Sequence, residues 1–429
     1  MTDQKNCCNG NNQTDDEPIK LNDVKINNDN SFDIEKSISV NLDDDSDDDI
    51  LQNIYSDIKQ PNHEMKTKTN KPIDPISILD KYKGVIWGCA IGDAIGLQFE
   101  GCDYRRANML VQRGIKFPTT QTGDRIRGVI KGDWTDDTDH MVLLLDSSYF
   151  DNDNIMRIDN KLFASKLVTW KFHGFPELGD TAGMGIGALI NKLISHPRFT
   201  IEPQIVSLEV YKMMGGDANT GKIDAPAPNG ALMRIAPLAL SEDYLNEILE
   251  HCIVTHYDGR CILTCLMQCE IIRYVIKTNS ITENDIREFY SHSIKILDKS
   301  FIDETNIYFK IGMNGLIGKL NEYGLIGTTI FEELEVGQYG NKRDKNGYTL
   351  VAFSIMLWAL RAAINGYNYE TIIKTIIGAG GDADTNAAIA GAVLGAYFGY
   401  SALPKDWIAS TPHRKWLDKK IMDFLNRTK

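Results

Sequence analysis

The chain has 429 residues, of which 42% are hydrophobic and 24% are charged, proportions typical of a water-soluble globular protein. Its formal charge of −13 is concentrated near the N-terminus, where residues 1–74 carry 17 acidic against 8 basic side chains. This balance argues against broad attraction to nucleic acid or to an anionic membrane, and the sequence lacks a run of 18 uncharged apolar residues that would predict a membrane-spanning helix.

The cellular compartment can be inferred from the N-terminus and the cysteines. Residues 1–13 are polar and lack the apolar core of a secretory signal. Eight cysteines in a chain of this length do not indicate a disulfide scaffold. We therefore expect a protein of the reducing cytoplasm or nucleus that is not secreted.

Residues 1–72 are rich in Asn, Asp, Ser and Lys, and they include the acidic run 43–49. Such a segment has too little apolar surface to offset the entropy lost on ordering, so we expect a disordered tail. The tail is either a solvated extension or a docking segment for a partner. Residues 73–429 are expected to form one catalytic domain, with a division into two domains as the alternative.

Beyond residue 76 the apolar residues recur at helical spacing, and alternating strand-like runs are scarce. Gly, Pro, Asp and Asn residues stand at many of the expected helix ends. The fold class predicted from this pattern is all-α. The expected helices span residues 76–100, 137–150, 160–172, 183–195, 230–240, 259–277, 304–321, 349–365 and 385–399.

The first expected helix carries small residues at positions 88, 90, 92, 94 and 96. This pattern is typical either of tight helix packing or of close ligand approach. Asp93 within it is interpreted as a structural hydrogen-bond acceptor or as a site residue, and Glu100 as a surface acid or as a site residue.

A first acidic cluster, Thr135-Asp136-Asp137, leads into an apolar helix. Thr135 is a suitable N-cap, and carboxylates near a helix N-terminus are favoured by the helix dipole. However, Asp133 and Asp139 flank the cluster, and capping explains only one or two acids. Adjacent carboxylates repel each other unless they share a cation or a proton.

A second cluster, Asp382-Ala383-Asp384-Thr385, follows a glycine-rich turn and opens a helix that is apolar on every side. Such a helix should be central, and a buried carboxylate there needs compensation. Gly380 and Gly381 supply the backbone freedom that lets both aspartates face one ion. Oxygen-only ligands favour hard ions, and two sets of three such ligands suit a pair of Mg²⁺ or Mn²⁺ ions.

Six motifs in this order resemble those of the ADP-ribosylglycohydrolase family, the group that includes the dinitrogenase-reductase-activating glycohydrolases. They are Gly92-Asp93-Ala94-x-Gly96, Trp134-Thr135-Asp136-Asp137-Thr138, Asn229-Gly230-Ala231-Leu232-Met233-Arg234-x-Ala236-Pro237, Thr255-His256, Gly347-Tyr348 and Gly381-Asp382-Ala383-Asp384-Thr385-Asn386. The resemblance covers residues 76 to about 425.

The resemblance implies a compact orthogonal helical bundle that hydrolyses the glycosidic bond of an ADP-ribosylated protein or a small ADP-ribose conjugate. It further implies two Mg²⁺ or Mn²⁺ ions, whose ligands match Thr135, Asp136, Asp137, Asp382, Asp384 and Thr385. We expect Asp136 or Asp137 to act on the attacking water, and Glu100 to orient the substrate or the water.

Substrate binding is assigned to six residues: Asp93, Gly183, Gly185, Asn229, Gly230 and His256. Asn229-Gly230-Ala231 before a helix would offer backbone N–H groups to a pyrophosphate. The glycines at 183, 185 and 187 either admit the ligand or allow helix packing, and His256 either contacts the ligand or belongs to the core. The loops 101–131 and 325–347 are expected to select the acceptor.

Two other readings stay open at the level of sequence. The fold could serve a module that binds ADP-ribose without turnover, or it could be purely structural. The complete set of acidic residues favours the enzyme, because recognition alone does not need two metal ions.

Overall fold

The computed structural model describes residues 75–115, 117, 130–216, 225–282, 284–289, 292–293 and 346–426. Within these ranges the chain is built mainly of helices, and its two strands form one short hairpin. The all-α fold class is therefore confirmed. Four expected features lie outside the described residues in whole or in large part: the tail 1–72, the helix 304–321, and the central parts of the loops 101–131 and 325–347.

The α-helices are α2 (Pro75–Gly96), α3 (Tyr104–Gln112), α4 (Asp136–Asp146), α5 (Asn160–His173), α6 (Ala188–Ile194), α7 (Pro203–Met213), α8 (Tyr244–Cys252), α9 (Gly259–Thr278), α14 (Thr349–Ile364), α15 (Tyr369–Gly378), α16 (Ala383–Phe398), α17 (Lys405–Ser410) and α18 (Arg414–Asn426). Short 3-10 helices are η2 (Leu97–Phe99), η3 (Pro176–Leu178), η4 (Ala236–Leu240) and η6 (Tyr400–Ala402). The hairpin pairs β1 (Ser148–Phe150) with β2 (Met156–Ile158) in antiparallel register.

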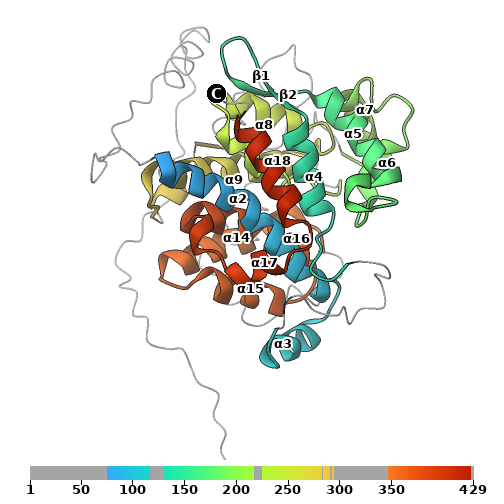
Figure 1. Cartoon of the computed structure of the whole chain (residues 1–429). Coiled ribbons are helices and arrows are strands. Elements are labelled where there is room, and N and C mark those ends of the chain that lie inside the picture. Colours follow the sequence, from blue (N-terminus) through green and yellow to red (C-terminus); the bar gives the residue numbers. More distant parts are fainter. Residues whose placement is uncertain are drawn as a thin grey trace, which may run out of the picture. The chain divides into compact units, whose positions relative to one another are not determined.

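Helices α2 and α16 lie side by side although they come from opposite ends of the described sequence (Figure 1). Gly84, Gly88, Gly92 and Gly96 form a glycine stripe along α2. A Cβ at Gly88 would lie 2.1 Å from the carbonyl oxygen of Gly391, and the other three would meet backbone atoms of α16 at 2.2 to 2.5 Å. The two backbones therefore touch, which confirms the tight helix packing expected from the small residues.

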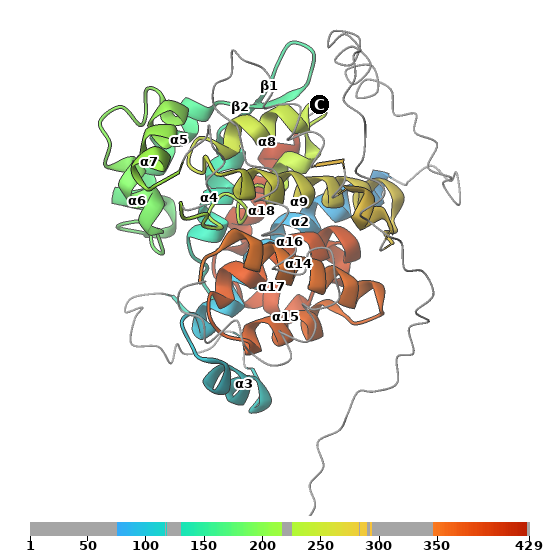
Figure 2. The same ribbon diagram turned by 180° about the vertical axis from the view of Figure 1, so that it is seen from behind.

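The core is continuous around this pair. α16 is buried from Ala383 to Ala396, and it also contacts α9, α14 and α15. Helices α5, α6 and α7 contact one another and form a separate group to one side in both views (Figures 1 and 2). Cys261, Cys265 and Cys269 recur every four residues along α9, and all three are buried. None of the described helices is both long and apolar enough to span a membrane.

Three expected helices differ from the structure. Residues 183–187 precede α6 as an irregular segment, because Gly185 adopts a φ of +93° that no helix accommodates. Residues 229–234 form turns, and 236–240 form the 3-10 helix η4 with Pro237 near its start, so the expected helix 230–240 was wrong. The helix expected over 137–150 ends at Asp146, since 148–150 pair with β2. The domain boundary at 72/73 and the compartment stay predictions.

Candidate metal centre

The two acidic clusters meet at the N-termini of α4 and α16. Thr385 on α16 donates its hydroxyl to Asp137 Oδ2 on α4 at 3.3 Å. The hydroxyl oxygen of Thr135, the N-cap residue of α4, lies 3.2 Å from the same oxygen. The convergence expected from the sequence therefore exists in the structure.

Asp93 on α2 joins the first cluster from a third helix. Its carboxylate is fully buried and accepts hydrogen bonds from the backbone N–H and the hydroxyl of both Thr135 and Thr138, at 2.7 to 3.1 Å. It thus satisfies the free N–H groups at the start of α4, which a capping side chain usually supplies from within the same helix. Because α2 packs directly on α16, this contact also brings α4 to α16.

Two sets of three carboxylates lie close enough to share an ion, with ligand oxygens within 4.8 Å of one another. One set is buried and comprises Asp93, Asp137 and Asp384; the other comprises Glu100, Asp382 and Asp384. Asp384 belongs to both sets. Two neighbouring positions with one shared carboxylate would suit a binuclear centre.

A glycine-rich turn places Asp382 at the start of α16. Gly380 and Gly381 have φ values of +73° and +71°, as the sequence suggested for this turn. The Gly381 N–H donates to the carbonyl of Cys102 at 2.9 Å, and the Gly101 N–H donates to the carbonyl of Gly381 at 2.8 Å. The turn is therefore fastened to the segment that follows Glu100, which holds that carboxylate beside Asp382.

Burial dominates the electrostatics of the cluster. It raises the pKa of Asp136, Asp137 and Asp384 well above the usual aspartate range, and the neighbouring negative charges raise these pKa values further. Loss of solvation raises the pKa of Glu100 to about 7, with a further contribution from Asp382. Burial also raises the pKa of Asp93 to about 6, although the hydrogen bonds from the N–H and hydroxyl groups of Thr135 and Thr138 lower this pKa.

One oxygen in this cluster has no partner. Asp137 Oδ1 is buried, and it accepts no hydrogen bond from any described residue. An unpaired buried carboxylate oxygen costs free energy, and a divalent cation would supply both the missing ligand contact and the missing charge. The donor set consists of carboxylate and hydroxyl oxygens, which fit Mg²⁺ or Mn²⁺.

The two acids that flank the first cluster, Asp133 and Asp139, have protein partners and are explained without an ion. Asp139 accepts the indole N–H groups of Trp134 and Trp170, each at 2.8 Å. Asp133 pairs with His413 on the segment before α18, at 3.5 Å. Trp170 and His413 lie far away in the sequence, so the motif by itself could not separate structural from site aspartates.

Asp136 contacts the irregular segment before α6. Among the described residues it belongs to neither set of three carboxylates. Its Oδ1 lies so close to Gly185 that a Cβ there would be 2.2 Å away. The irregular segment before α6 therefore covers Asp136, and only a glycine fits at this contact. The neighbouring Gly183 instead lies against the ring of Trp170.

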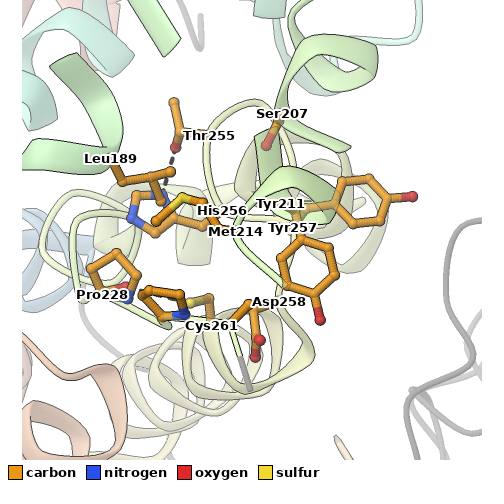
Figure 3. Close-up of a pocket in the computed structure, with 12 residues that line it drawn as sticks. Leu189, Ser207, Tyr211, Met214, Pro228, Thr255, His256, Tyr257, Asp258 and Cys261 are labelled. Atoms are coloured by element: carbon orange, nitrogen blue, oxygen red, sulfur yellow. Dashed lines mark hydrogen bonds between the residues drawn. The ribbon is translucent and has the colours of Figure 1, made fainter. Parts of the chain in front are cut away.

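The remaining predicted substrate residues surround the turn at 229–230. Asn229 donates its side-chain amide to Asp382 Oδ2 at 2.7 Å, so it positions a carboxylate of the second cluster. Gly230 lies against the imidazole of His256. His256 lines a cavity together with Leu189, Tyr211, Met214 and Pro228 (Figure 3). The expected helix N-terminus at Asn229 does not form, because turns and the 3-10 helix η4 follow it.

Comparisons with known proteins identify the same family along the whole described region. The family model described as ADP-ribosylglycohydrolase matches residues 74–429. The chain is similar to ADP-ribosylarginine hydrolase Tri1 of Serratia proteamaculans, with 26% identity over 341 residues that cover 77% of this chain and 75% of that protein. It is also similar to ADP-ribosylhydrolase ARH3 of Danio rerio, with 23% identity over 363 residues that cover 79% and 88%.

A solved structure supports the fold. The ADP-ribosylglycohydrolase-related protein complex matches with a TM-score of 0.50 at 20% identity, covering 82% of this chain and 100% of that one. At this level of identity the likeness concerns the fold alone. It confirms the expected type of all-α architecture.

Proposed function

This chain belongs to the ADP-ribosylglycohydrolase family, and we propose that it is a metal-dependent hydrolase of the bond between ADP-ribose and a protein side chain or small acceptor. The observation that carries the proposal is the meeting of two carboxylate sets that share Asp384. A module that only recognises ADP-ribose has no need for buried carboxylates that repel one another.

Six residues would hold two Mg²⁺ or Mn²⁺ ions: Thr135, Asp136, Asp137, Asp382, Asp384 and Thr385. Asp93 is added to this proposed set, because its carboxylate lies with Asp137 and Asp384. Bound divalent ions supply Lewis-acid polarisation and lower the pKa of water. The unpartnered Oδ1 of Asp137 supports the assignment, since it is the one buried carboxylate oxygen of the cluster without a donor in the described chain.

The protein side chains have separate roles in the proposed reaction. Cleavage at the anomeric carbon develops oxocarbenium-like positive charge, which nearby carboxylates stabilise. Asp136 or Asp137 accepts the proton of the attacking water. Glu100 lies at the exposed edge of its carboxylate set, where it can orient the substrate or the water. Asn229 holds Asp382 through its amide and so fixes the second cluster.

The test is a turnover panel with three substrates: ADP-ribosylarginine, ADP-ribosylserine and O-acetyl-ADP-ribose. Each is incubated with Mg²⁺ or Mn²⁺, with and without a chelator, and free ADP-ribose is measured. We expect release from at least one substrate that stops when the metal is removed. If ADP-ribose binds but no substrate is cleaved under any condition, the chain is a recognition module and the proposal is wrong.

Substitutions test whether the activity resides in the two acidic clusters. Asp136→Asn and Asp382→Asn should each reduce turnover by about a hundredfold or more, while circular dichroism shows the parental helix content. Asp133→Asn is the matched control, because its carboxylate lies three residues from Asp136 but faces His413. Turnover near the parental level in either site variant would remove that residue from the site.

A further inference from the structure

Arg234 is a buried cation without an acidic partner. Its side chain is fully buried, and no carboxylate of the described residues forms an ion pair with it. Burial lowers its pKa to about 10, so it stays charged at neutral pH. It donates to the carbonyl of Gly230 at 2.7 Å, to Thr255 Oγ1 at 2.6 Å and to His251 Nε2 at 3.3 Å.

These contacts determine the direction of the next hydrogen bond. A guanidinium can only donate, so Thr255 Oγ1 must be the acceptor from Arg234. The Thr255 hydroxyl keeps one proton, and His256 Nδ1 lies 2.7 Å away (Figure 3). Among the described residues Thr255 Oγ1 hydrogen-bonds only Arg234 and His256, so Nδ1 is the acceptor available to the hydroxyl proton, and Nδ1 is therefore unprotonated. Because burial and the charge of Arg234 lower the pKa of His256 well below its usual value, the neutral ring carries its proton on Nε2.

His251 provides an internal comparison. Its Nε2 accepts from Arg234, so its proton is on Nδ1, which lies 3.0 Å from Asn160 Oδ1. One buried arginine thus holds two neutral histidines in opposite tautomers. The two tautomers differ because a donor of this network faces Nε2 in His251 but Nδ1 in His256.

The protonated edge of His256 lies against a turn that contacts the proposed site. A Cβ at Gly230 would lie 3.1 Å from both Nε2 and Cε1, so this ring edge lies against the turn that also carries Asn229. Asn229 in turn contacts Asp382. The ring also lines the cavity of Figure 3, and none of the described residues forms a hydrogen bond with Nε2.

We propose that Arg234 and Thr255 are positioning residues that lock His256 as an Nε2–H donor toward an oxygen of the bound ADP-ribose group. The tautomer follows from the contacts alone, whereas the ligand rests on the proposed function. His256 is then a neutral donor and does not act as an acid or base.

The tautomer is tested by nitrogen NMR of the full chain labelled with 15N-histidine. The protein has eight histidines, and His256→Gln identifies the resonances of His256. The parent should show a protonated Nε2 and an unprotonated Nδ1 at pH 7.5. Thr255→Ser keeps the hydroxyl and should keep this spectrum, whereas Thr255→Val should populate the Nδ1–H form. A parent spectrum with the proton on Nδ1 would overturn the proposal that Arg234 and Thr255 set the tautomer of His256.

The ligand contact is tested with ADP-ribose itself, by calorimetry on the metal-loaded chain. Thr255→Val should weaken ADP-ribose binding by about tenfold, the effect of one hydrogen bond, and Thr255→Ser should not. Thr255→Ala is a second variant without the hydroxyl, in case valine lowers the melting temperature. Parental affinity in a valine or alanine variant whose spectrum has changed would refute the contact.

The two proposals can fail separately. If the parent cleaves substrate but the hydroxyl-deleted variants bind ADP-ribose normally, the contact is wrong and the proposed function stands. If the parent binds no ADP-ribose, the ligand assignment fails, turnover alone decides the proposed function, and the NMR spectrum alone decides the tautomer.

Discussion

Replacing Gly185 by alanine would place a methyl group against the carboxylate of Asp136. The added Cβ would lie 2.2 Å from Asp136 Oδ1. A carbon and an oxygen do not approach within about 3 Å without a bond, so the two must separate by about 1 Å. Asp136 is a short side chain at the start of α4, so the added methyl group changes the position of its carboxylate relative to the segment before α6.

The size of the effect has two components. Gly185 has a φ of +93°, and a non-glycine residue there costs about 1–2 kcal/mol of stability from the backbone alone. The displacement of Asp136 adds a loss of activity, because a misplacement of about 1 Å in a catalytic group can cost about a hundredfold in rate. We therefore expect Gly185→Ala to fold with a modestly lower melting temperature and to lose about a hundredfold in turnover.

Gly179 is the matched control. Its φ of +92° imposes the same backbone cost, but no atom lies within 4 Å of a Cβ added there. Gly179→Ala should therefore lose similar stability and keep its activity. The assay compares metal-dependent ADP-ribose release and melting temperature for both variants. Equal activity in the two variants would refute the claim that the segment before α6 positions Asp136.

Three further predictions address the core, the charges and the aspartates. Gly391→Ala should cost about 3 kcal/mol or more in urea unfolding, since its Cβ would lie 2.1 Å from the facing backbone carbonyl, whereas Gly187→Ala, which meets nothing within 4 Å, should change stability by less than about 0.5 kcal/mol. The raised pKa values of Asp93, about 6, and Glu100, about 7, mean that these two acids bind protons more tightly in the folded metal-free protein than in the unfolded chain, so their contribution to stability falls from pH 5.5 to pH 7.5, whereas the lowered pKa values of His140, His251 and His256 contribute in the opposite direction. Protons compete with Mg²⁺ for the carboxylates, so Mg²⁺ should raise the melting temperature more at pH 7.5 than at pH 5.5, and an equal Mg²⁺ shift at both pH values would count against the site. Asp139→Asn should lower stability by about 1–3 kcal/mol without weakening Mg²⁺ binding, because that carboxylate serves two indole N–H groups; loss of Mg²⁺ binding in a folded variant would contradict this.

The elements that sequence reasoning identified are those with a local physical signature. The apolar helix after Asp384 must be central, and it is buried from Ala383 to Ala396. The small residues on α2 indicate close packing, and the glycine stripe touches α16. A pair of glycines before Asp382 indicates a turn with positive φ, and both have it. In each case the residue type restricts the backbone or the burial without knowledge of distant partners.

The features that were missed depend on partners far along the chain. Asp139 looks identical to Asp136 in sequence, and the position of Trp170 on α5, together with the nearby Trp134, makes it a structural acceptor. Asp93 was interpreted as a structural hydrogen-bond acceptor or as a site residue, and its hydrogen bonds fasten α4; its place beside Asp137 and Asp384 depends on residues far along the chain. The helix expected at 230–240 failed because Gly230 and Pro237 interrupt the helical pattern.

The glycine stripe and the carboxylate sets constrain each other. Asp93 lies beside Asp384 because the α2 and α16 backbones touch, and any Cβ between them would separate the two carboxylates. That proximity is unfavourable for the metal-free protein, because burial and mutual repulsion raise the pKa of each acid. Tight packing of the two apolar helices can offset part of this electrostatic cost. A bound divalent cation would attract the carboxylates that repel one another in the metal-free protein, so the electrostatic contribution to stability would become favourable. A chain that keeps both the stripe and the acids is therefore expected to gain stability when it binds metal, and the gain should disappear when Asp384 is replaced by asparagine.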